Sequence, residues 1–156
     1  MKIKSVEHFG IARKIVSNMT SESWETIPHA CVTYEADVTK LFDVLKEINS
    51  GKDKSQKITV NTAMLRIIVE GLKACQKMNG HIEFNRKLVR GKITTLENID
   101  ISMPVVLNTG EMMTINMHDM GSKNMSQMRD AIADSMRRAN NSDMNEVMFE
   151  VSMDNT

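Results

Sequence analysis

The chain has 156 residues, of which 41% are hydrophobic and 26% charged, and its 20 basic side chains match its 20 acidic ones in number. This length fits a single domain with a buried core, and no apolar run approaches the roughly 20 residues that span a bilayer. Because the charge is balanced, nothing attracts the whole chain to nucleic acid or to a membrane surface, and we expect neither as a partner.

The N-terminus and the sulfur-containing residues favour a cytoplasmic protein. The first residues are charged and lack the apolar stretch of an export signal. Cys31 and Cys75 have no zinc-site spacing, so we expect two buried, reduced thiols. Fifteen methionines, against one Trp, one Tyr and four Phe, predict a core filled in part by flexible thioethers.

The N-terminal quarter of the chain predicts a helix followed by a strand. Apolar residues recur every three or four positions from about Glu7 to Met19, which predicts an amphipathic helix, and a polar linker follows at residues 20–23. Residues 27–39 predict a central strand, because Pro28 suits only the beginning of a strand and the β-branched and aromatic side chains after it suit a pleated surface.

Another amphipathic helix is predicted directly after this strand. Asp37 or Thr39 can cap it, and its apolar face repeats at intervals of three, four and seven residues up to Ile48. Residues 49–57 form a lysine-bearing loop, in which Gly51 is well placed to end the helix. A solvated surface loop is a better interpretation of this segment than a phosphate site.

The next helix is predicted to be the most buried one. Thr59 can cap it, and its apolar positions from Val60 to Cys75 cover more than one narrow stripe. It is expected to end at residues 78–80, where Gly80 is free to adopt a positive φ.

Two strand pairs are predicted after that helix. Residues 82–89 suggest a strand pair of modest quality, and residues 99–107 with 112–117 suggest a hairpin. Pro104 indicates that the first arm of the hairpin lies at an edge or contains a bulge. The methionine-rich second arm is a candidate contact surface.

The last predicted helix begins with a capping box. Asn124 is followed three residues later by Gln127, and the apolar face of the helix ends near residues 140–141. A short apolar run follows at residues 147–151.

The motifs with the clearest chemistry are absent from the sequence. There is no phosphate-binding loop, dinucleotide-binding glycine motif, zinc-protease motif or serine nucleophile elbow. Among the four histidines, His29 follows Pro28 at the entrance of the predicted strand, where its ring could point into a cleft. We take His29 as a candidate for lining a channel, with a hydrogen-bonded structural role as the alternative.

The order of these segments resembles the catalytic domain of the dihydrolipoamide acyltransferases of 2-oxo acid dehydrogenase complexes, which share the fold of chloramphenicol acetyltransferase. The matching segments, in chain order, are the N-terminal helix, Pro28–His29, residues 35–39, residues 58–61, Met78–Asn79, residues 99–102 and residues 123–125. The resemblance implies an α/β fold with a two-layer mixed β-sheet, helices on one face and the last strands lacking. Residues 1–156 would then be the N-terminal portion of that domain, without a lipoyl or subunit-binding domain.

The family's catalytic motif, a histidine followed four residues later by Asp or Asn and then by Gly, has no match. Only His81 has an amide four residues on, at Asn85, and Arg86 rather than glycine follows it. We therefore assign no catalytic residue and no metal ligand, and leave the cofactor-binding residues unassigned. The truncated sheet is expected to leave apolar edges exposed.

The resemblance also implies substrates and partners. Coenzyme A and lipoamide would be substrates, with no cofactor bound covalently, and the protein would be a homo-oligomer, a trimer by resemblance. A C-terminal half or a separate lipoyl-bearing protein would be a further partner. Three hypotheses stay open: a portion of an acyltransferase that is inactive alone, a non-catalytic oligomeric assembly protein derived from the family, and an α/β domain with an architectural likeness only.

Overall fold

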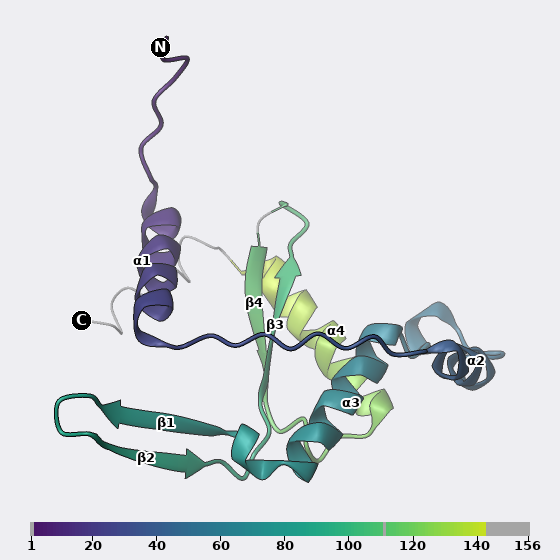
Figure 1. The fold of residues 1–156 in the computed structure, drawn as a ribbon. Coiled ribbons are helices and arrows are strands. Elements are labelled where there is room, and N and C mark those ends of the chain that lie inside the picture. The colour runs from purple at the N-terminus through teal and green to yellow at the C-terminus, as the bar shows by residue number, and fades with distance from the viewer. Residues whose placement is uncertain (1, 111, 143–156) are drawn as a thin grey trace. The chain divides into compact units, whose positions relative to one another are not determined.

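A computed structural model describes residues 2–110 and 112–142 (Figure 1). The described residues up to Ala36 belong to one compact unit, and Asp37–Asn140 form a second. The apolar run predicted at residues 147–151 lies outside the described residues. No helix in the described ranges is long and apolar enough to cross a bilayer.

The first unit contains helix α1 (Ile11–Thr26), which begins and ends later than predicted. Gly10 takes the extended N-cap conformation, a position where glycine is well tolerated, so residues 7–9 precede the helix. Residues 20–23 are helical instead of forming a linker. The last turn is closed by the Thr26 hydroxyl, which donates to the carbonyl oxygen of Glu22 at 2.6 Å.

The central strand predicted at residues 27–39 is wrong. Residues 28–38 have no regular secondary structure, and Val32 and Tyr34 are 92% and 87% exposed. No described segment pairs with this stretch, and β-branched side chains favour a strand only where a neighbour completes the hydrogen-bond ladder and covers one face.

The second unit begins with helix α2 (Thr39–Ile48), as predicted. Of the two candidate capping residues, Asp37 is the acceptor. Its carboxylate accepts hydrogen bonds from the backbone N–H of Thr39 at 2.9 Å and from the Thr39 hydroxyl at 2.6 Å. The loop after α2 contains a 3-10 turn, η1 (Lys54–Gln56). The Asn49 side chain closes this loop, because it accepts from the N–H of Ile58 at 2.7 Å and donates to the carbonyl oxygen of Ile58 at 2.8 Å.

Helix α3 (Val60–Ala74) buries more residues than any other described helix, as predicted. Thr59 caps it by accepting from the N–H of Thr62 at 3.2 Å. The predicted end at residues 78–80 is wrong, since α3 ends at Ala74 and a 3-10 turn, η2 (Gln76–Met78), follows. Gly80 is not at positive φ; it begins a strand, where a Cβ would lie 2.6 Å from the carbonyl oxygen of Thr94.

The predicted hairpin of residues 99–107 with 112–117 is present. The strand pair predicted within residues 82–89 is only partly correct, because its second arm, Leu88 and Val89, lies in the turn, where Val89 has a φ of 48°, and the second strand begins after it. β1 (Gly80–Asn85) pairs with β2 (Arg90–Thr95), and β3 (Ile101–Val106) pairs with β4 (Met112–Met117). The α/β class is confirmed, and in the described ranges the sheet consists of these two separate pairs without a parallel pairing. Pro104 lies opposite Thr114 in an unbroken register, which agrees with an edge position and not with a bulge.

Helix α4 (Met125–Asn141) begins with the predicted capping box. The N–H of Asn124 donates to the side-chain oxygen of Gln127 at 2.9 Å, and the N–H of Gln127 donates to the side-chain oxygen of Asn124 at 3.0 Å. Two free N–H groups of the first turn are thereby satisfied.

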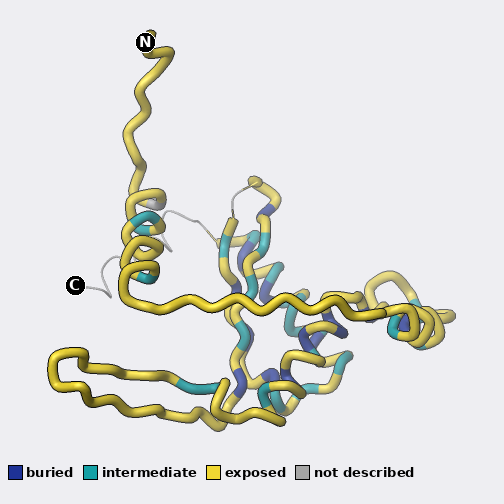
Figure 2. The backbone as a smooth tube through the Cα atoms, viewed as in Figure 1, coloured by how far each residue is buried: buried dark blue, intermediate teal, exposed yellow. Residues whose placement is uncertain are grey.

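The core lies in the second unit, where the buried positions of Figure 2 concentrate on its helices and on the β3–β4 pair. Met120 and Met128 are fully buried, which confirms that thioethers fill part of the core. A cluster of Leu45, Ile58 and Ala63 joins α2 to the start of α3. The expectation of buried cysteines is wrong, because Cys31 and Cys75 are free and exposed.

Replacing Gly71 by alanine is expected to raise the free energy of unfolding by about 0.5–1 kcal/mol, because glycine in a helix interior costs this much relative to alanine. A Cβ at Gly71 would meet nothing within 4 Å, so no clash offsets the gain. Urea denaturation measures the change. Gly80→Ala is the matched control and should destabilise, and a stabilising Gly80→Ala or a destabilising Gly71→Ala would contradict this account.

Candidate functional site

The predicted site residue His29 lies in the irregular segment that follows α1. Its ring stacks on Trp24, with centroids 5.3 Å apart and planes 25° apart. His29 is exposed, and none of four cavities that lie along α2, α3 and the β1–β2 hairpin includes it. Its role as a channel-lining residue stays a prediction.

A polar cluster that the sequence reasoning missed connects the start of β3 to the turn between β4 and α4. We call Asp100, His118, Asp119, Ser122 and Lys123 the Asp100 cluster. One carboxylate oxygen of Asp100 lies 2.8 Å from Nδ1 of His118, and the other accepts from the N–H of Asp119 at 2.8 Å. Asp119 itself has a φ of 51°, so the carboxylate holds an unusual turn in place.

The other polar groups of the Asp100 cluster stabilise the same turn. The Lys123 ammonium donates to the carbonyl oxygens of His118 at 2.6 Å and Asp119 at 2.9 Å. The Ser122 hydroxyl bonds to the carboxylate of Asp119 at 2.6 Å and not to His118. The cluster therefore lacks the serine–histidine contact that nucleophilic catalysis needs, and its geometry is that of a structural turn.

The hydrogen bond from the N–H of Asp119, and then that from His118, lowers the pKa of Asp100. Because the folded pKa is below the unfolded one, the ionised carboxylate stabilises the fold at neutral pH, and this contribution is lost as the pH falls below about 4. Asp100→Asn is expected to weaken the acid dependence of stability. Thermal melting of both proteins between pH 3 and pH 7, in steps of roughly half a unit, measures it. If the melting temperatures of the two proteins fall equally as the pH is lowered, ionised Asp100 does not stabilise the fold.

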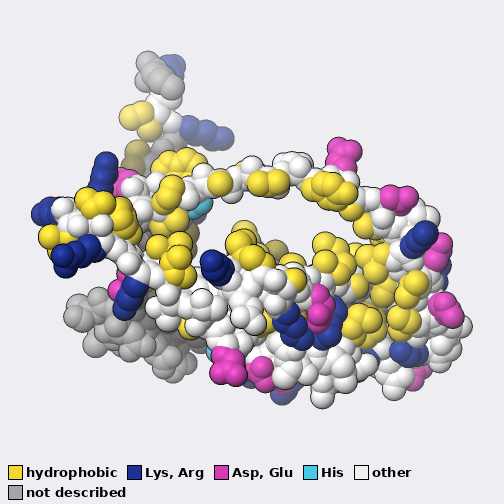
Figure 3. Space-filling view, turned by 60° about the horizontal axis from the view of Figure 1, so that its bottom comes forward, with side chains coloured by type: hydrophobic (Ala, Val, Ile, Leu, Met, Phe, Trp, Pro, Cys, Tyr) yellow, Lys and Arg dark blue, Asp and Glu magenta, His cyan; other side chains and the backbone are white. Residues whose placement is uncertain are grey.

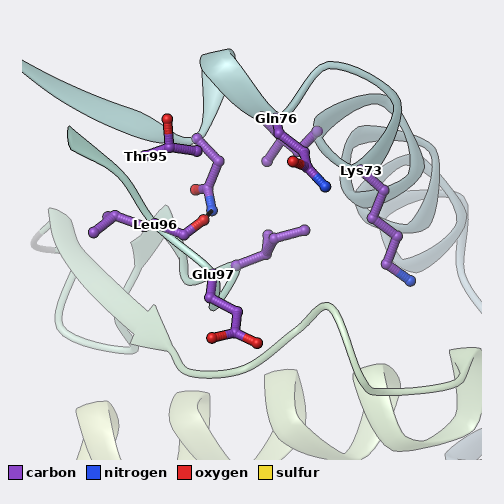
Figure 4. Close-up of a pocket in the computed structure, with 8 residues that line it drawn as sticks. Lys73, Gln76, Thr95, Leu96 and Glu97 are labelled. Carbon is purple, nitrogen blue, oxygen red and sulfur yellow. Dashed lines mark hydrogen bonds between the residues drawn. The ribbon is translucent and has the colours of Figure 1, made fainter. Parts of the chain in front are cut away.

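Two neighbouring cavities lie beside the join between the β1–β2 hairpin and β3. One has a volume of about 330 Å³, and the residues labelled in Figure 4 show Lys73 and Gln76 on one wall and Thr95 to Glu97 on the other. The second measures about 690 Å³ and includes His81 and Asp100.

Asn79 contributes to the lining of both cavities and fixes the wall between them. Its side-chain amide donates to the carbonyl oxygens of Leu96 and Asn98, both at 2.9 Å. No described residue in either cavity forms a nucleophile–base pair, and no group of three His, Cys, Asp or Glu among the described residues could hold a metal ion. The cavities are candidate binding spaces without catalytic chemistry of their own.

Within the described ranges, helices accompany two antiparallel strand pairs, an arrangement of the α/β class. Residues 2–152 match the family of 2-oxoacid dehydrogenase acyltransferases (catalytic domain). The chain belongs to this family, which confirms the resemblance seen in its sequence.

Curated relatives agree with the family match. The dihydrolipoyllysine-residue acetyltransferase component of the Rickettsia bellii pyruvate dehydrogenase complex is 32% identical over 100 residues, which are 63% of this chain and 22% of the relative. The corresponding Rickettsia prowazekii protein is 26% identical over 140 residues, which are 88% of this chain and 33% of the relative. The chain thus spans a third or less of the length of these relatives.

Solved structures share the fold. The dihydrolipoamide acetyltransferase of Azotobacter vinelandii superposes with a TM-score of 0.72 at 18% identity, over 90% of this chain and 56% of that one. A probable dihydrolipoamide acetyltransferase of Listeria monocytogenes superposes with a TM-score of 0.73 at 20% identity, over 89% of this chain and 57% of that one. The cubic core of a pyruvate dehydrogenase multienzyme complex superposes with a TM-score of 0.69 at 20% identity.

Proposed function

We propose that residues 1–156 form the N-terminal portion of an acyltransferase catalytic domain that, when complete, transfers an acyl group between lipoamide and coenzyme A. The observation that supports this most strongly is the family match over residues 2–152. The relatives are named as dihydrolipoyllysine-residue acetyltransferases, which supports lipoamide as one substrate. No cofactor is proposed to be bound covalently, and no lipoyl or subunit-binding domain is proposed within these residues.

The chain alone is proposed to be inactive. Acyl transfer to a thiol needs a general base near the sulfur and donors aimed at the oxyanion. His118 has a carboxylate partner, but the residue four positions later is Ser122 and not Asp or Asn. We therefore place the base and the oxyanion donors in the part of the domain that this chain does not span, with His29 as a wall of the substrate channel.

The partners follow from the same proposal. The likeness to the cubic core of a multienzyme complex supports a homo-oligomer, for which we propose a trimer. The further partners would be the C-terminal part of the domain and a lipoyl-bearing protein, in the cytoplasm.

A second candidate function is that of a non-catalytic assembly protein. Large side chains that are exposed on the hairpin β1–β2, such as Ile82 and Phe84, favour it, because apolar surface of this kind marks contact sites. This candidate predicts a stable oligomer that neither binds coenzyme A nor transfers an acyl group.

Co-expression distinguishes the two functions. The chain would be produced together with the portion of the Listeria monocytogenes protein that it does not cover, and the purified pair assayed for acetyl transfer from acetyl-coenzyme A to dihydrolipoamide. Turnover that exceeds that of the Listeria portion alone supports the acyltransferase. A purified pair without turnover would overturn it and favour the assembly protein.

A further inference from the structure

The smaller of the two cavities beside the β1–β2 hairpin lies between the end of α3 and the chain that joins β2 to β3. Its volume is about 330 Å³, near the lower end of the range for pockets that bind small molecules. Its apolar lining consists of Leu72, Leu96 and Ile99, and Ile99 is only 5% exposed. The cavity therefore offers an apolar floor to a small ligand.

Polar groups without partners surround this floor. The Glu97 carboxylate, the Gln76 amide and the Thr95 hydroxyl line the cavity, and none of them forms a hydrogen bond or ion pair with another described side chain. Apolar side chains also gather on the open surface in Figure 3, but the cavity differs from that surface because polar groups converge on it. An apolar pocket with a few converging polar groups is the usual form of a small-molecule site.

The two charged side chains of the cavity have opposite signs and come from opposite walls (Figure 4). Lys73 and Glu97 do not form an ion pair with each other. Among the described residues the Lys73 ammonium bonds to Glu70 alone, at 3.3 Å, which leaves it further N–H donors. A ligand that carries both a carboxylate and an ammonium group would pair with both walls at once.

The backbone on both sides of Glu97 is held in place by Asn79. The side-chain amide of Asn79 donates to the carbonyl oxygens of Leu96 and Asn98, both at 2.9 Å, and the backbone carbonyl oxygen of Asn79 accepts from the N–H of Leu96 at 2.8 Å. These bonds fix the wall that carries the Glu97 carboxylate before a ligand arrives. A wall that is already ordered lowers the entropic cost of binding.

We propose that this cavity binds a free α-amino acid with an apolar side chain. The Lys73 ammonium binds the α-carboxylate of the ligand, and the Glu97 carboxylate binds its α-ammonium group. The side chain of the ligand lies against Leu72 and Ile99, and the Gln76 amide supplies a further hydrogen bond. The inference does not depend on the proposed acyltransferase function, because all of these residues lie within the second unit of this chain.

An NMR titration of the full 156-residue chain with L-leucine tests the proposal. Saturable binding is expected with a Kd of about 1 mM or lower, together with a shift of the side-chain amide resonance of Gln76. Isocaproate is leucine without its ammonium group, and isoamylamine is leucine without its carboxylate. Each analogue should bind at least about tenfold more weakly than leucine, because each loses one charged hydrogen-bonding group.

Two substitutions assign the charges. Glu97→Gln and Lys73→Met each remove one charge and retain most of the side chain, and each is expected to weaken leucine binding at least about tenfold. Glu97→Gln should leave the Kd of isocaproate unchanged, and Lys73→Met that of isoamylamine. The matched controls are Glu83→Gln and Lys92→Met, which break an exposed ion pair of 3.0 Å on the hairpin and should leave the Kd of leucine unchanged.

Several results would overturn the inference. A chain that leucine does not saturate at millimolar concentrations has no such site. Equal affinities for leucine and its two analogues would show that the charged groups are not recognised, and an unchanged Kd for leucine in Glu97→Gln and Lys73→Met would exclude these side chains as its partners. Shifts that leave Gln76 unaffected would place the ligand outside the cavity. The melting temperature of each variant should stay close to that of the wild type, because the substituted side chains are exposed.

Discussion

Replacing Met128 by alanine is expected to lower the free energy of unfolding by about 2–5 kcal/mol. Met128 lies in the first turns of α4 and is fully buried, so truncation removes apolar contacts and leaves a cavity in the core. A domain of this size has a total stability of about 5–15 kcal/mol, and the loss is therefore a large fraction of it. Urea denaturation measures the change.

The control for Met128 uses the same substitution at an exposed methionine. Met112 is 71% exposed on β4, and Met112→Ala should change the free energy of unfolding by less than about 0.5 kcal/mol. Equal effects at the two positions would show that the packing around α4 differs from that described.

Replacing Asn49 by alanine is expected to lower the free energy of unfolding by about 1–3 kcal/mol. The substitution removes both hydrogen bonds to the backbone of Ile58, a residue that is only 4% exposed, and leaves its N–H and carbonyl groups without partners. The loop between α2 and α3 would then lose its closure. Amide hydrogen exchange at Ile58 should quicken along with the loss in stability.

Asn61 provides the comparison for Asn49. It is exposed in the first turn of α3, and Asn61→Ala should leave stability within about 0.5 kcal/mol of wild type. If Asn49→Ala behaves like Asn61→Ala, the side-chain closure of the loop does not stabilise the fold.

The elements that the sequence predicts well are those fixed by residues close together in the chain. Thr59 caps α3 through a residue three positions later, and Asn124 and Gln127 bond to each other across the same interval. The β3–β4 hairpin likewise joins segments separated by a short turn. Local hydrogen bonds of this kind can be recognised from residue types and spacing alone.

The predictions that failed depend on distant residues. The strand expected around Val32 needed a partner strand that no described segment supplies. Gly80 is required by the approach of Thr94 across a hairpin, not by a helix end. The Asp100 cluster joins residues 18 and 19 positions apart, and only the β3–β4 register brings them together. Asp100 and Lys123 both lie in segments that resemble the family, and this resemblance was the one feature of the sequence that pointed to the Asp100 cluster.

The most direct test of the proposed function is an acetyl-transfer assay on the purified 156-residue chain alone, with acetyl-coenzyme A and dihydrolipoamide as substrates. We expect no turnover above the uncatalysed rate, because the described histidines lack the base and oxyanion arrangement of an acyltransferase. Turnover that survives repurification and is lost in His29→Ala would contradict this account and make His29 part of a complete active site.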